Sequence, residues 1–82
     1  MVLISASARK ELRKMGCTGP NFLRVSKKHN QGSRCGFFID SITTKEDEII
    51  HDGEIKVITD LSSTPFMHNL SIDFDKSGIT IS

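Results

Sequence analysis

The chain has 82 residues, and its eleven lysine and arginine residues against ten acidic residues leave a formal net charge of +1. This length predicts a single domain over residues 1–82 with a modest core, because so small a chain buries only about 60% of its unfolded surface. No apolar run approaches the roughly 20 residues of a membrane span, and the first residues lack the apolar core of a signal sequence. We therefore expect no membrane association and a cytoplasmic location.

The charges are divided unevenly along the chain. Residues 1–34 carry eight basic residues and one acid, a balance of +7, and residues 35–82 carry three lysines and nine acids, a balance of −6. Such asymmetry fits either a basic surface for nucleic acid or two parts that attract each other within one chain or across a dimer. No aromatic residue lies among the basic ones to stack on bases, which disfavours nucleic acid as a partner.

The first predicted elements are a short edge strand over residues 2–4 and a helix after it. Ser5 or Ser7 can cap the start of this helix, and Gly16 can terminate it just after Met15. Pro20 prevents the helix from continuing, so residues 17–21 are predicted to form a turn. The apolar residues spaced to lie on one buried helical face are Ala8, Leu12 and Met15.

The rest of the chain has the pattern of a β-rich fold. Asp52 and Gly53 form a strong hairpin signal, residues 26–34 form a polar loop, and a short second helix is predicted within residues 61–67. One amphipathic helix on mixed or antiparallel strands is an α+β architecture. The predicted strands cover residues 22–25, 35–42, 48–51, 54–60, 70–74 and 79–81.

The side chains best suited to bind a metal or to react are two cysteines and three histidines. Cys17 and Cys35 are too few for a disulfide framework, so each is either a small buried apolar residue or a metal or redox group. His29 lies in the loop before Cys35 and is the histidine best placed to approach it, whereas His51 and His68 fit surface or turn positions. No paired-cysteine or paired-histidine metal motif is present, and no nucleophile–base signature supports an enzyme.

Taken in order, these segments resemble the HesB-like family of A-type iron–sulfur cluster carriers. The resemblance covers almost the whole chain and depends on the order and spacing of five segments. They are LISASARKELRKM (3–15) at the strand-then-helix start, FLRV (22–25) at the second strand, SRCGFF (33–38) at the loop before a ligand cysteine, DGEIKVITDLSSTPFMHNLSIDF (52–74) at the block from glycine to a closing strand, and SGITIS (77–82) after it.

The resemblance implies a compact fold of strands with one or two helices, usually dimeric or of higher oligomeric state, and a non-enzymatic role. Such carriers bind iron or an iron–sulfur cluster and pass it to apoproteins. Three cysteines usually ligate, of which the one that opens the central strand matches Cys35. The other two form a C-x-C that this sequence lacks, and Gly36 stands where the family has a serine.

Two functional hypotheses follow from this match. Iron–sulfur clusters are held mostly by four thiolates, and one Cys35 per chain supplies only two in a homodimer. Cys17 or His29 could add ligands if the fold brought them near Cys35. The first hypothesis is therefore a HesB-like binder or carrier of iron or a cluster, altered by its missing ligands, with apoprotein clients or assembly proteins as partners. The alternative is a cluster-free protein-interaction module that keeps the fold.

Overall fold

Seven strands and one helix make up the described part of the chain. The computed structural model describes residues 1–27, 35–61, 63–64 and 69–82. In chain order the elements are β1 (Val2–Ile4), α1 (Ala6–Lys14), β2 (Phe22–Lys27), β3 (Cys35–Asp40), β4 (Asp47–Asp52), β5 (Lys56–Asp60), β6 (Leu70–Asp75) and β7 (Gly78–Ile81).

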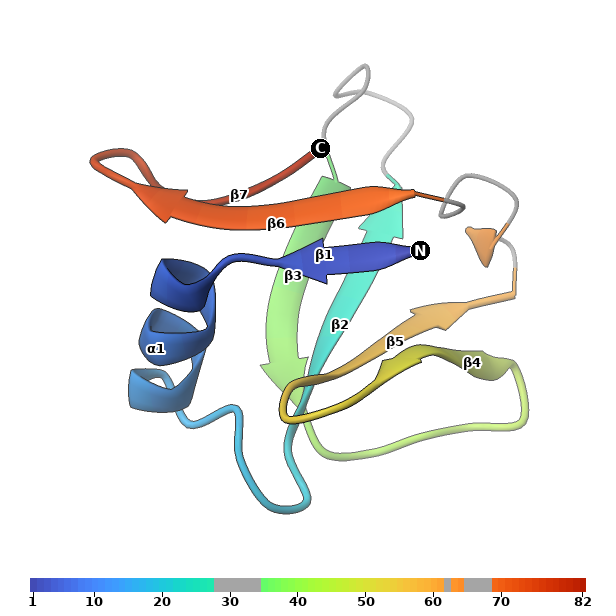
Figure 1. Ribbon diagram of the computed structural model, residues 1–82. Coiled ribbons are helices and arrows are strands. Elements are labelled where there is room, and N and C mark those ends of the chain that lie inside the picture. Colours follow the sequence, from blue (N-terminus) through green and yellow to red (C-terminus); the bar gives the residue numbers. More distant parts are fainter. Residues whose placement is uncertain (28–34, 62, 65–68) are drawn as a thin grey trace.

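The strands form two sheets that cross each other (Figure 1). The three-stranded sheet has the order β1-β6-β7, and the four-stranded sheet has the order β3-β2-β5-β4. Each sheet contains one parallel pair, β1 with β6 and β2 with β5, and the remaining pairs are antiparallel. The β-rich α+β class with mixed strands, one N-terminal helix and a hairpin at Asp52 and Gly53 is therefore confirmed.

The helix α1 begins where a serine can cap it. Ser5 Oγ accepts a hydrogen bond from the Ala8 N–H at 3.1 Å, which satisfies one free donor of the first turn. Gly16 follows the helix with a φ of +95°, a left-handed conformation that glycine adopts without strain. Met15 was expected on the buried face but is 44% exposed, because the helix ends before it. No helix in the described ranges is long and apolar enough to cross a membrane.

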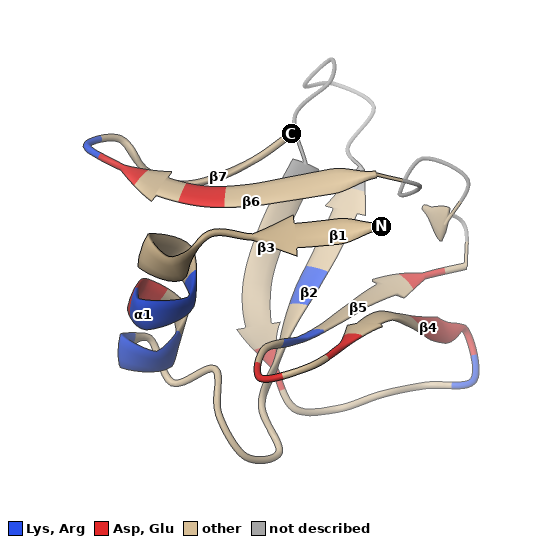
Figure 2. Ribbon diagram, viewed as in Figure 1, with Lys and Arg blue, Asp and Glu red and all other residues tan. Residues whose placement is uncertain are grey.

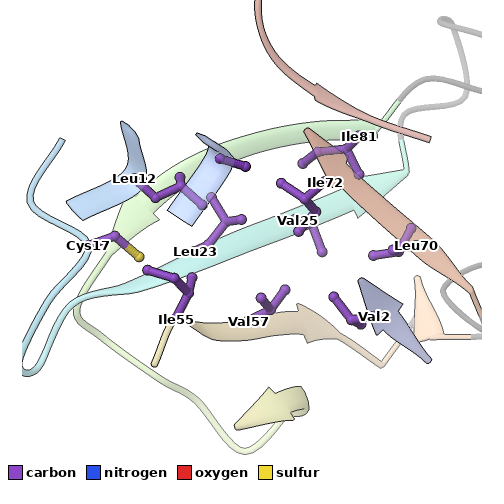
Figure 3. Packing of buried hydrophobic residues seen from close by; sticks show 11 residues of the cluster. Val2, Leu12, Cys17, Leu23, Val25, Ile55, Val57, Leu70, Ile72 and Ile81 are labelled. Atoms are coloured by element: carbon purple, nitrogen blue, oxygen red, sulfur yellow. The ribbon is translucent and has the colours of Figure 1, made fainter. Parts of the chain in front are cut away.

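The hydrophobic core fills the space between the two sheets and α1 (Figure 3). Leu23 and Val25 of β2 and Val57 of β5 enter this core, whereas the neighbouring Phe22 and Ile58 are also buried but are not part of this cluster. From the other sheet, Leu70 and Ile72 of β6 alternate with exposed residues. The other residues of this core are Val2, Ala8, Leu12, Cys17, Ile55 and Ile81.

The region around β3 differs from the prediction in two ways. The strand ends at Asp40 rather than residue 42, because the Asp40 carboxylate accepts hydrogen bonds from the N–H groups of Ser41 and Ile42 and turns the chain. The strand that Cys35 opens is also the edge strand of the four-stranded sheet, not a central one. The short second helix expected within residues 61–67 falls largely on residues outside the described ranges.

A charged cluster holds the segment that crosses the outer face of the four-stranded sheet. Because β3 and β4 lie at opposite edges, residues 41–46 must pass over the strands between them. Arg24 of β2 donates from Nε to Asp40 at 3.0 Å and from Nη1 and Nη2 to Asp47 at 2.7 and 2.8 Å. Its Nη2 also donates to the Ile42 carbonyl at 3.0 Å. One guanidinium thus fastens both ends of the crossing segment to the middle of the sheet.

Replacing Arg24 by methionine is expected to weaken the fold most at neutral pH. Hydrogen bonds from Arg24 and from the Thr44 N–H lower the pKa of Asp47 to about 2. A carboxylate with a lowered pKa adds stability that is complete above its unfolded pKa of about 3.9 and is lost as the pH falls through its folded value. In urea unfolding, the stability gap between the wild type and Arg24→Met should therefore narrow between about pH 4 and about pH 2.

The matched control for this prediction is Lys45→Met. Lys45 is an exposed cation in the same crossing segment and forms no ion pair with the residues that the structure describes. Its removal should change stability little at any of these pH values, since exposed charges contribute little. A gap for Arg24→Met that stays constant from pH 7 to pH 2 would contradict the proposed role of the ion pairs.

Candidate functional site

Cys35, the predicted metal ligand, is the first residue of β3. Its backbone is in register with Lys27, the last residue of β2, in the antiparallel β2–β3 pair. The residues between these two positions, 28–34, lie outside the described ranges, and so does His29. The structure therefore places Cys35 where an edge strand begins, at the end of β2 that is remote from α1 (Figure 1).

Cys17 has the surroundings of a core residue. Its backbone N–H donates to the Leu12 carbonyl at 2.9 Å, and its side chain is 1% exposed. Figure 3 shows the sulfur close to Leu12, Leu23 and Ile55. Burial raises the pKa of this thiol, which disfavours the thiolate that a metal or a redox reaction requires.

The fold does not bring the two cysteines together within one chain. Cys17 packs beside Leu23, near the start of β2, whereas Cys35 pairs with Lys27 at the other end. The four-residue step from Leu23 to Lys27 spans about 13 Å of extended strand. Bonds between metals and cysteine sulfur are far shorter, about 2.3 Å for zinc, so this separation is too long for one shared metal.

The other candidate metal ligands do not lie close to one another either. Within the described ranges, no group of three or more histidine, cysteine, aspartate or glutamate residues is close enough to hold a metal ion. His51 lies near the end of β4, where its Nε2 is 3.0 Å from the position that a Cβ on Gly53 would take. Of the three predicted ligands, Cys17 is buried in the core, His29 lies outside the described ranges, and Cys35 opens an edge strand.

A second cluster, which the sequence did not single out, lies where α1 meets the β4–β5 hairpin. Arg9 and Arg13 both form ion pairs with Glu54, with a separation of 3.8 Å between Arg9 Nε and Glu54 Oε2. Arg9 also donates from Nη1 to the Ile4 carbonyl at 3.0 Å. The opposite charges of the two parts of the chain were the available signal, but they do not identify which residues pair.

The ion pairs confirm that these two parts attract each other within one chain. Arg9, Arg13 and Arg24 belong to the basic part, and all their described carboxylate partners belong to the acidic part. Figure 2 shows basic residues on α1 and β2, and acidic residues on β4, the β4–β5 hairpin and β6. The remaining exposed lysines of α1 are solvent-facing.

Comparison by sequence finds no counterpart for this chain. The sequence matches no protein-family model, and no curated protein matches it.

Among the solved structures that share this fold are two proteins connected with iron–sulfur clusters. One is Escherichia coli SufA, involved in the biosynthesis of iron–sulfur clusters, with a TM-score of 0.69 and 18% identity over 99% of this chain and 78% of SufA. The other is IscA with a [2Fe-2S] cluster, with a TM-score of 0.75 and 14% identity over 99% of this chain and 81% of IscA. At these sequence identities the likeness shows the fold alone. It confirms the expected HesB-like fold.

Proposed function

We propose that this chain belongs to the A-type carriers and binds iron or an iron–sulfur cluster as cargo through Cys35. The observation that carries the proposal is the match of 99% of the chain to IscA, whose crystal structure contains a [2Fe-2S] cluster. The position of Cys35 at the start of an edge strand supports it, because an edge strand has a neighbouring strand on one side only.

The residues of one chain suit a shared site better than a complete one. Cys35 is a single thiolate, and no three-residue ligand group exists in the described part of the chain. A homodimer would supply two thiolates of the four that usually hold a cluster. The remaining positions would be open to ligands from other molecules, as transfer of the cargo to an apoprotein client requires. A role of this kind needs no catalytic residues, and we place the protein in the reducing cytoplasm, where thiols persist.

The test is anaerobic reconstitution of the purified chain with ferrous iron and sulfide. We expect visible charge-transfer absorption, bound iron and acid-labile sulfide in equal amounts, and a native mass of two chains with one cluster. A colourless protein without bound iron would overturn the proposal.

The alternative is an interaction module that keeps the fold without a cluster. Two observations favour it. No group of metal ligands lies together in the described residues, and Cys17 is surrounded by apolar core residues. It predicts that the colourless protein still binds its partner and that Cys35→Ser leaves this binding unchanged. The reconstitution experiment therefore decides between the two functions.

A further inference from the structure

A groove of about 330 Å³ lies between β1 and the β4–β5 hairpin. One wall is the strand β1, the opposite wall is the end of the hairpin, and Arg9 of α1 joins the two. Neither cysteine lines it. The lining residues are Val2, Leu3, Ile4, Arg9, His51, Glu54 and Ile55.

The wall formed by β1 is a sheet edge, and the hydrogen bonds of β1 show which backbone groups face β6. The Leu70 N–H donates to the Met1 carbonyl, and the Ser5 N–H donates to the Ile72 carbonyl, both at 3.0 Å. Along a strand, the two backbone groups of successive residues point alternately to opposite sides. The Met1 carbonyl, the backbone groups of Leu3 and the Ser5 N–H therefore face β6, and residues 2 and 4 direct their backbone groups to the other edge.

At this other edge the backbone is available for pairing. No strand of the described chain pairs with β1 there. The Ile4 carbonyl accepts the hydrogen bond from Arg9, which confirms the direction of its backbone groups. The Val2 N–H, the Val2 carbonyl and the Ile4 N–H remain directed into the groove. An edge with such groups is a template onto which an extended chain can add.

Arg9 and Glu54, which line the groove, form a charged trio with Arg13, which lies beside the groove. Arg9 and Arg13 share the single carboxylate of Glu54, so this trio keeps one net positive charge. The His51 ring is half-buried at the opposite wall and makes no hydrogen bond with any residue that the structure describes. Leu3, 59% exposed, adds an apolar surface beside these polar groups. The groove thus combines backbone pairing, an apolar contact and a site that attracts a carboxylate.

We propose that this groove binds an extended segment of another protein that carries an acidic side chain. The segment adds to the edge of β1 as a further strand, pairs with the backbone of Val2 and Ile4, and presents its carboxylate to Arg9. Side chains that alternate along it contact Leu3. This proposal goes beyond the cluster-binding function and does not depend on it, because neither Cys35 nor a metal takes part.

The test is a titration of the metal-free chain with a six-residue peptide of alternating valine and threonine that carries one central glutamate, followed by amide NMR. The Val2 and Ile4 amides should shift, and exchange of the Ile4 amide should slow, whereas the Leu3 amide, already directed to β6, should change little. Arg9→Gln should weaken binding about tenfold, the loss expected for one charge-assisted hydrogen bond. The control Lys10→Gln removes the same charge from the same helix, outside the groove, and should leave binding unchanged.

Two further peptides make the result independent of any effect of Arg9 on folding. Replacing the peptide glutamate by glutamine should weaken binding to the wild-type chain to a similar extent, and methylating the peptide backbone nitrogens should abolish it. Equal binding of the methylated peptide, or no shift at millimolar peptide, would overturn the proposal. Protection of the Ile4 amide that grows with protein concentration alone would show that a second copy occupies the edge, and would overturn it as well.

Discussion

Cys35→Ser is expected to abolish the visible absorption and the bound iron of the reconstituted protein. The thiolate is the metal-binding form of cysteine, and a serine hydroxyl keeps its proton at neutral pH and is a poor ligand for iron. Because Cys35 is the first residue of an edge strand of the four-stranded sheet, we expect this loss without global unfolding. Absorption, iron and sulfide analysis of both proteins measure the effect, and circular dichroism checks the fold.

The matched control is Cys17→Ala. Cys17 is 1% exposed, packs against core residues near the opposite end of β2, and its pKa is raised by burial. Its replacement should lower stability modestly, by about 1 kcal/mol, and leave the bound iron unchanged. Reconstitution of Cys35→Ser to the wild-type level would contradict the assignment of Cys35. Loss of iron in Cys17→Ala, with the fold intact, would show that a structural change brings the two cysteines together.

Leu23→Ala is expected to cost about 3 kcal/mol of unfolding free energy, because it leaves a cavity in the middle of the core. Leu23 is 0% exposed, lies on β2 between β3 and β5, and is part of the cluster between the two sheets. For a domain of this size such a loss lowers the melting temperature by roughly 15 °C. Thermal and urea unfolding monitored by circular dichroism measure it.

The control for this core substitution is Leu3→Ala, which removes the same atoms from a side chain that is 59% exposed. Its effect should stay within about 0.5 kcal/mol, the range of surface substitutions. Equal losses for the two variants would mean that the packing between the sheets is not the main source of stability. The Leu3→Ala variant can also be used in the peptide titration, because Leu3 lines the proposed docking groove.

The docking groove and the cluster-binding proposal describe two separable properties of one fold. Cargo would be bound where β3 begins, whereas the peptide would bind along β1, on the other sheet. A carrier has to recognise the protein that receives its cargo, and an edge that accepts an extended acidic segment provides one means of recognition. A colourless protein that still binds the peptide would favour the interaction module over the carrier.

Local signals in the sequence determined most elements of the fold. Gly16 predicted the end of α1 and the pair Ser5 and Ser7 its start, where Ser5 is the cap, because capping depends on neighbouring residues alone. The alternation of Leu70 and Ile72 with polar residues predicted β6, and the Asp52–Gly53 pair predicted the hairpin before β5. The order of these segments led to the HesB-like resemblance, which the structural neighbours confirm for the fold.

Only the tertiary structure decided which segments meet. The parallel pairs of β1 with β6 and β2 with β5 join distant parts of the chain, and no local pattern encodes such a partner. For the same reason the sequence could not show that β3 is an edge strand, that Arg24 holds both Asp40 and Asp47, or that Cys17 lies in the core away from Cys35. Periodicity and capping act within a few residues, whereas strand order, ion pairs and the separation of two cysteines follow from packing across the whole chain.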